Sequence, residues 1–65
     1  MYVLMRGDEV VDKVSAPKGT PISRITELLM RSNGIAGTWE VQRPTLAWIR
    51  DVSMDSFVDW EVRWI

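Results

Sequence analysis

The segment from Thr20 to Gly34 is the best-marked element of the sequence, and it limits the folds that the chain can adopt. Pro21 suits the first position of a helix, because its missing N–H is not needed there and its φ is already helical. Apolar residues recur at helical spacing and form one stripe: Ile22, Ile25, Leu28 and Leu29. Asn33 and Gly34 supply a stop signal, in which Gly34 takes the left-handed conformation. We predict one helix over residues 21–33, with Thr20 as its capping residue.

Strand-like runs lie on both sides of this helix. The runs at residues 2–5 and 10–16 are separated by Gly7-Asp8, which is a hairpin turn signal. The first run is apolar on both faces, so we expect it to be the more central strand, and we expect the second to be half-buried. The inward side of the second run is predicted to carry Val10, Val14 and Ala16.

Three further segments follow the helix. The runs 39–42 and 46–49 are interrupted by Pro44, which cannot donate to a sheet ladder and marks a turn, a bulge or an edge. Residues 53–57 are predicted to form one short helical turn. The final run, residues 59–64, places tryptophan and valine on one face and charged residues on the other. We expect the first and last strands to pair at the centre of the sheet.

This order of elements predicts a single α+β domain over residues 1–65, in which a small mixed sheet of four or five strands packs on one helix. The chain is near the lower size limit for an independent domain, because the apolar surface that it can bury roughly offsets the entropy lost on ordering. It has no cysteine and no histidine, so neither a disulfide nor a zinc site adds stability. A partner or self-association is therefore expected to supply further burial.

The first half of the chain resembles ubiquitin-like β-grasp proteins in its opening hairpin, its proline-containing exit and its capped helix. The matching residues are Thr20 as the cap, Ile22, Ile25 and Leu29 as the inward stripe, and Gly34-Ile35 as the stop. The resemblance covers about residues 1–35 and implies a β-grasp-like fold, which often docks proteins through its sheet face or edge. Modifiers and sulfur carriers of that family react through a terminal Gly-Gly carboxylate. This sequence instead ends in Arg63-Trp64-Ile65, so that chemistry is not expected here.

The absence of cysteine and histidine also excludes thiol nucleophiles, Ser-His-Asp triads and the usual zinc, haem and iron–sulfur ligand sets. Four carboxylates follow one another around the last loop: Asp51, Asp55, Asp59 and Glu61. Their spacing differs from that of an EF-hand loop, and we interpret them as a solvated acidic face. We predict no catalytic residue, no metal site and no cofactor, and we do not expect the chain to be an enzyme.

The charge balance bears on the partner and on the location. Eight basic and nine acidic residues give a net charge of −1, without the basic excess that non-specific nucleic-acid binding requires. Residues 36–65 are the more acidic part, with three arginines against five acidic groups. No apolar run is long enough for a membrane span or a signal peptide, so we expect a cytoplasmic protein without a membrane partner.

All four tryptophans lie between residues 39 and 64. A core this small has difficulty burying all of them together with Phe57, so we expect one or two to be partly exposed, with Trp48 and Trp64 as the candidates. Exposed tryptophan is enriched at the centres of protein interfaces. The predicted partner-binding residues are Trp48, Trp64, Trp39, Arg50 and Arg63.

We therefore predict a small non-enzymatic module for protein–protein interaction or assembly. It is expected to bind another protein, or a second copy of itself, through its Trp-rich C-terminal sheet surface. Size and analogy suggest an accessory or inhibitor protein of a phage or mobile element, or a particle subunit. Two alternatives remain open: a nucleic-acid-binding module that uses arginine and tryptophan to stack on bases, and a divergent carrier-type β-grasp protein.

Overall fold

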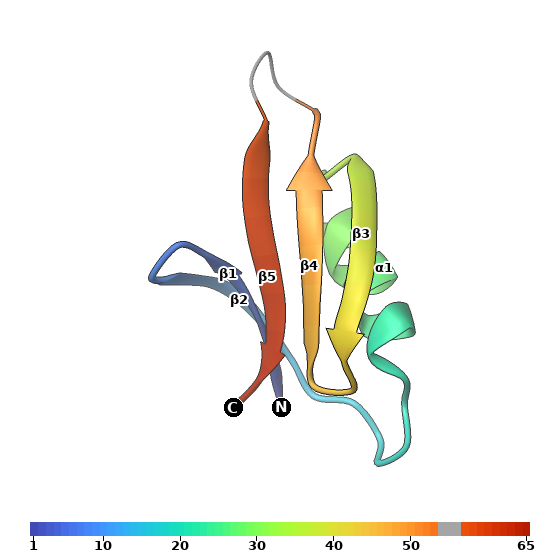
Figure 1. Cartoon of the computed structure of the whole chain (residues 1–65). Helices are drawn as coiled ribbons and strands as arrows, with labels where there is room; N and C mark the ends of the chain where they lie inside the picture. Colours follow the sequence, from blue (N-terminus) through green and yellow to red (C-terminus); the bar gives the residue numbers. More distant parts are fainter. Residues whose placement is uncertain (54–56) are drawn as a thin grey trace.

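The computed structural model of the chain describes residues 1–53 and 57–65, in which five strands form one sheet and a helix lies against it (Figure 1). The elements in chain order are β1 (Tyr2–Arg6), β2 (Glu9–Val14), α1 (Ile22–Ser32), β3 (Gly37–Arg43), β4 (Leu46–Asp51) and β5 (Val58–Trp64). The helical turn predicted for residues 53–57 lies largely outside the described residues. The α+β class is confirmed.

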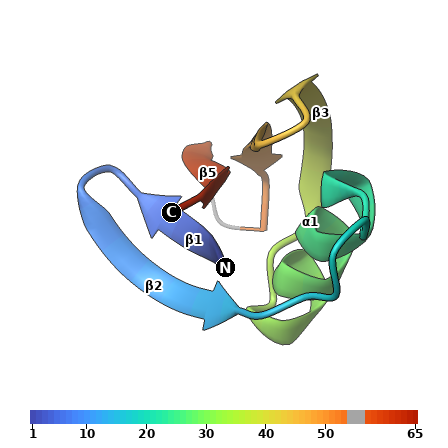
Figure 2. The same cartoon turned by 90° about the horizontal axis from the view of Figure 1, so that it is seen from below.

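The first and last strands pair at the centre of the sheet, as the sequence predicted. The strand order is β2-β1-β5-β4-β3, and Tyr2 of β1 lies opposite Trp64 of β5. The two edge strands, β2 and β3, are joined by α1, which crosses one face of the sheet (Figure 2). The strand order places the N-terminal and C-terminal strands in contact and leaves β2 and β3 as the two edges.

The expectation of a mixed sheet is wrong, because all four neighbouring strand pairs are antiparallel. Three of these pairs join strands that follow one another in the chain without an intervening helix, and such strands return alongside each other in opposite directions. A parallel pair arises when a helix connects two neighbouring strands, and here α1 connects strands at opposite edges. This strand order does not establish a β-grasp topology.

The helix matches its predicted position, but its capping differs. The Thr20 hydroxyl donates to the Pro17 carbonyl oxygen over 2.7 Å and closes the preceding turn, and α1 has no side-chain cap. Pro21 occupies the N-cap position without a side-chain hydrogen bond. At the other end the predicted stop is confirmed: Gly34 has φ 66°, and the Ile35 N–H donates to the Met30 carbonyl oxygen over 2.9 Å.

The buried stripe of α1 is rotated from the predicted one. Ile22, Ile25 and Leu29 are buried as expected, whereas Leu28 is 46% exposed. Thr26 and Met30 take the remaining inward positions. Because each helical residue advances by about 100°, Leu28 lies about a third of a turn from the centre of a stripe made by Ile22, Thr26 and Leu29.

The core lies between α1 and the helix-facing side of the sheet. Leu4, Ala47, Ile49 and Val62 are completely buried there. Val10 was expected on this side and is instead 44% exposed. The register shifts between Leu4 and Met5, so that Leu4 lies opposite Asp12 and Met5 lies opposite Val10. The extra residue of this bulge turns Val10 to the opposite side of the sheet from Val14.

Candidate functional site

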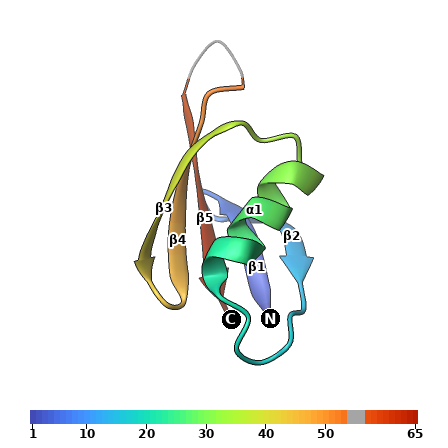
Figure 3. The same cartoon turned by 90° about the vertical axis from the view of Figure 1, so that its right-hand side faces the viewer.

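The two sides of the sheet differ, and the candidate site lies on the side opposite α1 (Figure 3). Leu4, Val62 and Ala47 share one register row and belong to the core, so their sequence neighbours point the other way. We call this opposite side the outer face. It is formed by Val3 and Met5 from β1, Thr38 and Glu40 from β3, Leu46, Trp48 and Arg50 from β4, and Asp59, Glu61 and Arg63 from β5.

Trp48 occupies the middle of the outer face. Its register neighbours are Glu40 on β3 and Glu61 on β5, and its side chain is half-buried. The guanidinium carbon of Arg50 lies 5.1 Å from the centroid of the Trp48 ring and 5.7 Å from that of the Phe57 ring. Cations are attracted to the faces of aromatic rings. Trp48, Arg50 and Phe57 therefore form one cluster, which we call the Arg50 cluster.

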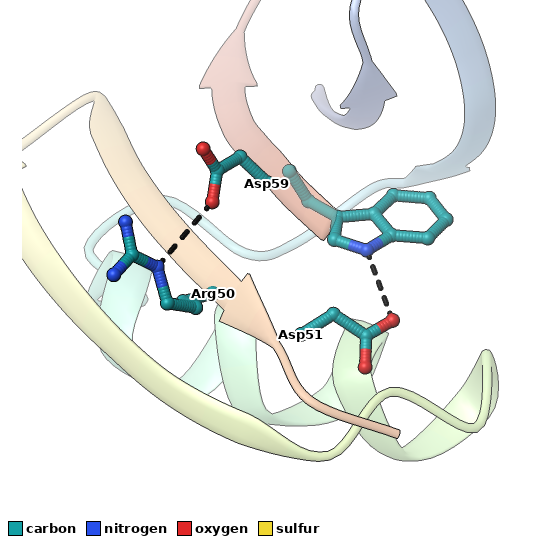
Figure 4. Close-up of polar contacts among 4 residues, drawn as sticks. Arg50, Asp51 and Asp59 are labelled. Atoms are coloured by element: carbon teal, nitrogen blue, oxygen red, sulfur yellow. Dashed lines mark hydrogen bonds and ion pairs between the residues drawn. The ribbon is translucent and has the colours of Figure 1, made fainter. Parts of the chain in front are cut away.

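Both strand arginines of the predicted site have a carboxylate neighbour. Arg50 Nε lies 3.6 Å from Asp59 Oδ1 (Figure 4), and Arg63 Nη1 lies 3.9 Å from Glu61 Oε2. All four side chains are about half exposed, and exposed ion pairs contribute at most about 1 kcal/mol each. Their main effect is to balance the charge of the outer face, since each cation sits beside an anion.

An apolar residue lies beneath the charged side chains of the outer face. Val3 is completely buried, although it is not a member of the core cluster between the sheet and α1. Its register neighbours are Lys13 and Arg63, and Arg63 in turn lies opposite Leu46. Long basic side chains lay their aliphatic stems along apolar surface and keep their charged ends in water. The outer face therefore combines an apolar layer with balanced charges above it.

The structure divides the five predicted site residues between the two sides of the sheet. Trp48, Arg50 and Arg63 lie on the outer face, while Trp39 and Trp64 lie on the helix side. Trp39 is half-buried and packs against the core cluster. Trp64 is 52% exposed, as predicted, and its ring meets that of Tyr2 edge-to-face at 5.1 Å. The five residues do not form one surface.

Phe57 is a member of the Arg50 cluster that the sequence did not indicate. It is 71% exposed and precedes the first residue of β5. The alternation of a strand assigns a face only to residues inside that strand. Phe57 stands outside the alternating run, so no periodic signal predicted the direction of its side chain.

Asp51, one of the predicted acidic residues, is buried and hydrogen-bonded. Its carboxylate accepts from the Ser53 N–H over 2.9 Å and from the Ser53 hydroxyl. It also accepts from Trp60 Nε1 over 3.2 Å, a bond drawn in Figure 4. The Ser53 hydroxyl is the main cause that holds the pKa of Asp51 below its usual 3.8; burial opposes the shift, and the Ser53 N–H and the Trp60 indole add to it. Asp51 thus fixes the end of the β4–β5 pair.

Among the described residues, the remaining carboxylates of this run, Asp59 and Glu61, do not gather into a metal site. Asp59 and Glu61 are in ion pairs with arginines, and Asp55 lies outside the described residues. Among the residues that the structure describes, no three metal-ligating side chains come together. Two open hollows of about 470 and 430 Å³ adjoin Tyr2, and their linings contain one titratable group besides Tyr2 itself, which is Lys18.

Comparison of the chain with protein-family models, with curated proteins and with solved structures finds no match in any of the three. Within residues 1–53 and 57–65, no helix has the length and apolar character needed to cross a lipid bilayer.

Proposed function

We propose that the chain is a small non-enzymatic module that binds another protein stoichiometrically through its outer face. The observation that carries this proposal is the Arg50 cluster, in which a half-buried Trp48 and an exposed Phe57 flank one guanidinium on a side of the sheet that no described helix covers. Tryptophan and arginine are among the residues enriched at the centres of protein interfaces. A partner that covers this cluster removes two aromatic rings from water.

The charges around Trp48 favour a protein over a nucleic acid as the partner. Two carboxylates, Glu40 and Glu61, are its register neighbours, and they repel phosphate groups. Arg50 and Arg63 are already beside Asp59 and Glu61. A protein surface that carries both positive and negative groups is compatible with this pattern. A phosphate backbone is attracted less strongly, because each arginine charge is already offset by a neighbouring carboxylate.

The resemblance of residues 1–35 to ubiquitin-like β-grasp proteins remains a prediction, and it agrees with docking through a sheet face. The same holds for a role as an accessory or inhibitor protein of a phage or mobile element, or as a particle subunit. Within this proposal the chain acts by occupying a surface, so its effect depends on stoichiometry and not on turnover.

The test uses the immobilised chain to capture proteins from cell extract, followed by the same capture with variants. We expect Trp48→Ala and Arg50→Glu to abolish capture of a partner that the original chain retains in nearly equimolar amount. Trp64→Ala is the matched control, because Trp64 is also an exposed tryptophan but lies on the helix side. Circular dichroism verifies that each variant is folded.

Two results would contradict the proposal. One is a partner retained equally by Trp48→Ala and by the original chain, which would place the contact elsewhere. The other is a partner lost on nuclease treatment and released steeply by added salt, which would indicate a nucleic acid, since phosphate contacts weaken with salt concentration.

A further inference from the structure

The strand β3 leaves one sheet edge open. It is the last strand of the order β2-β1-β5-β4-β3 (Figure 1). All its residues except Trp39 are exposed. The opposite edge, β2, is interrupted by a bulge within its pairing to β1. The irregularity of β3 falls only at its end, between Val41 and Arg43. Residues 37–41 thus form a regular segment of edge strand.

A hydrogen bond next to β3 shows which backbone groups of this segment are unused. The Val52 N–H donates to the Ala36 carbonyl oxygen over 2.7 Å, and these two residues continue the register in which Gly37 lies opposite Asp51. Bonded and non-bonded pairs alternate along an antiparallel ladder. The backbone groups of alternate residues therefore point away from β4 into the space beyond the edge: Gly37, Trp39 and Val41.

The pairing on the far side of β4 gives the same phase independently. The Trp64 N–H donates to the Thr45 carbonyl oxygen over 3.1 Å, which continues the register between β4 and β5. Because bonded and non-bonded pairs alternate from this bond, the backbone N–H and C=O groups of Ala47 and Ile49 point to β5, and those of Trp48 point to β3. Two separate hydrogen bonds thus agree on the free groups of the edge.

We propose that β3 pairs with β3 of a second copy of this chain, antiparallel, about a two-fold axis at Trp39. In this register Trp39 lies opposite its own counterpart and Gly37 lies opposite Val41 of the second copy, so all the outward N–H and C=O groups are bonded. A register centred on Glu40 places two carboxylates opposite each other, which is destabilising. A register centred on Val41 meets the irregularity before Arg43 and bonds fewer groups.

The side chains on the outer face are complementary in the same register. Thr38 lies opposite Glu40 of the second copy, so its hydroxyl is placed to donate to that carboxylate. Within its own chain Thr38 lies opposite Arg50. Glu40 of one copy is then two strands, roughly 10 Å, from Arg50 of the other, a span that two long side chains bridge. The two-fold axis makes both contacts twice.

The observations favour a second copy over a foreign strand, because one register of β3 with itself bonds every outward group, opposes no like charges and brings Glu40 toward Arg50. Closed two-fold pairing also matches the commonest symmetry of homo-oligomers. The pairing groups are the backbone N–H and C=O groups along β3, whereas the proposed function rests on the Arg50 cluster. Thr38, Glu40 and Arg50 of the outer face border the edge, but the inference does not depend on the proposed function.

The experiment measures the solution mass by sedimentation equilibrium over a dilution series, for the original chain and two variants. Val41→Pro removes an N–H that β4 does not use, so it blocks edge pairing and spares the monomer's own ladder. Its matched control is Val41→Thr, which keeps the N–H and the β-branch. Thr38→Glu adds a carboxylate opposite Glu40 of the second copy, while within its own chain the new group lies opposite Arg50 and favours folding.

We expect the original chain to dimerise. Val41→Pro removes two backbone hydrogen bonds per dimer and is expected to raise the dissociation constant roughly 30-fold or more. Thr38→Glu is expected to raise it as well, whereas Val41→Thr is expected to leave it unchanged. Amide hydrogen exchange gives a second readout. The amides of Gly37, Trp39 and Val41 are expected to slow as concentration rises, while those of Thr38 and Glu40 are slow at every concentration.

A chain that remains monomeric up to about millimolar concentration would overturn the proposal, since the pairing would then be weaker than about −4 kcal/mol. So would a dimer that Val41→Pro leaves intact, or a β3 edge occupied only by a strand of another protein. A dimer that is abolished by Trp48→Ala but unaffected by Val41→Pro would show that the copies do not pair through the β3 edge. It would instead indicate that they associate through the outer face. Conversely, loss of the proposed function in the capture experiment leaves the edge dimer unaffected.

Discussion

The amide of Asn33 donates from Nδ2 to Oδ2 of Asp12 over 3.0 Å, and this bond joins the C-terminal cap of α1 to the edge strand β2. The same nitrogen donates to the Leu29 carbonyl oxygen over 2.8 Å. Asn33 thus satisfies one of the last carbonyls of the helix and at the same time ties the helix to the sheet. The second oxygen of Asp12 accepts from the Lys13 N–H over 2.8 Å.

This link predicts a pH-dependent contribution to stability. The Asn33 amide, followed by the Lys13 N–H, holds the pKa of Asp12 below its usual 3.8 in the folded chain, against a smaller opposing effect of burial. A carboxylate with a lowered folded pKa stabilises the fold above its unfolded pKa, and this contribution is lost as pH falls through the folded value. We expect Asn33→Ala to raise the pKa of Asp12 in an NMR titration and to flatten the acid-unfolding curve below about pH 4.

Ser32→Ala is the control for that measurement, since Ser32 is an exposed neighbour at the same helix end. It is expected to leave the pKa of Asp12 and the acid unfolding unchanged. An Asp12 pKa that stays the same in Asn33→Ala would show that the amide does not interact with the carboxylate in solution.

The rotated helix stripe gives a prediction with an internal control. Leu29 is 2% exposed and belongs to the core cluster, while its neighbour Leu28 is 46% exposed. Truncation of a buried leucine leaves a cavity, so we expect Leu29→Ala to lower the free energy of unfolding by about 2–5 kcal/mol. Leu28→Ala is expected to cost less than about 1 kcal/mol. Urea unfolding of the two variants measures the difference, and equal costs would mean that the helix is rotated from the position described.

Features of the fold that depend on residues close together in the chain were easier to predict than features that depend on the pairing of distant segments. The helix limits and its Gly34 stop were predicted because capping and periodicity depend on residues within a few positions. The central position of β1 followed from its apolar character on both faces, and its pairing with β5 from the place of these two strands at either end of the element order. The Thr20 cap failed because α1 begins one residue later, with Pro21 at the N-cap position, and the Thr20 hydroxyl donates to the Pro17 carbonyl in the preceding turn. The position of Val10 failed because a bulge is a property of two strands together.

The candidate site was only partly predictable for the same reason. Residue types selected the tryptophans and arginines of the C-terminal half, and alternation correctly placed Trp60, Val62 and Trp64 on one side of β5. Whether Trp39 and Trp48 share a side depends on how β3 is aligned with β4. Their register puts Trp39 opposite Ile49 in the core and Trp48 opposite Glu40 on the outer face. That alignment is set by the turn at Pro44 and the adjacent irregularity, which no local pattern specifies.

A buried hydroxyl on α1 predicts a stabilising substitution. Thr26 is completely buried, and its Oγ1 has no hydrogen-bond partner among the described residues. An unpaired buried hydroxyl costs about 1–3 kcal/mol, and valine has nearly the same shape without the polar atom. We expect Thr26→Val to raise the free energy of unfolding by about 1 kcal/mol, measured by urea unfolding. Thr26→Ser keeps the hydroxyl, loses the methyl group and is expected to destabilise; a Thr26→Val variant that is less stable than the original chain would show that the hydroxyl is satisfied.

Gly37, the first residue of β3, is predicted to tolerate a side chain less well than Gly7. A β-carbon added at Gly37, which has φ 153°, would overlap the backbone carbonyl oxygen of Arg50 on the neighbouring strand, and only a shift of the backbone relieves it. A β-carbon at Gly7 meets nothing within 4 Å, so Gly7→Ala carries only the cost of its φ of 60°, about 1–2 kcal/mol. We expect Gly37→Ala to cost clearly more than Gly7→Ala in urea unfolding, and to speed amide exchange at the Arg50 end of β4. Equal costs for the two variants would mean that the start of β3 lies farther from β4 than the register of Gly37 with Asp51 requires.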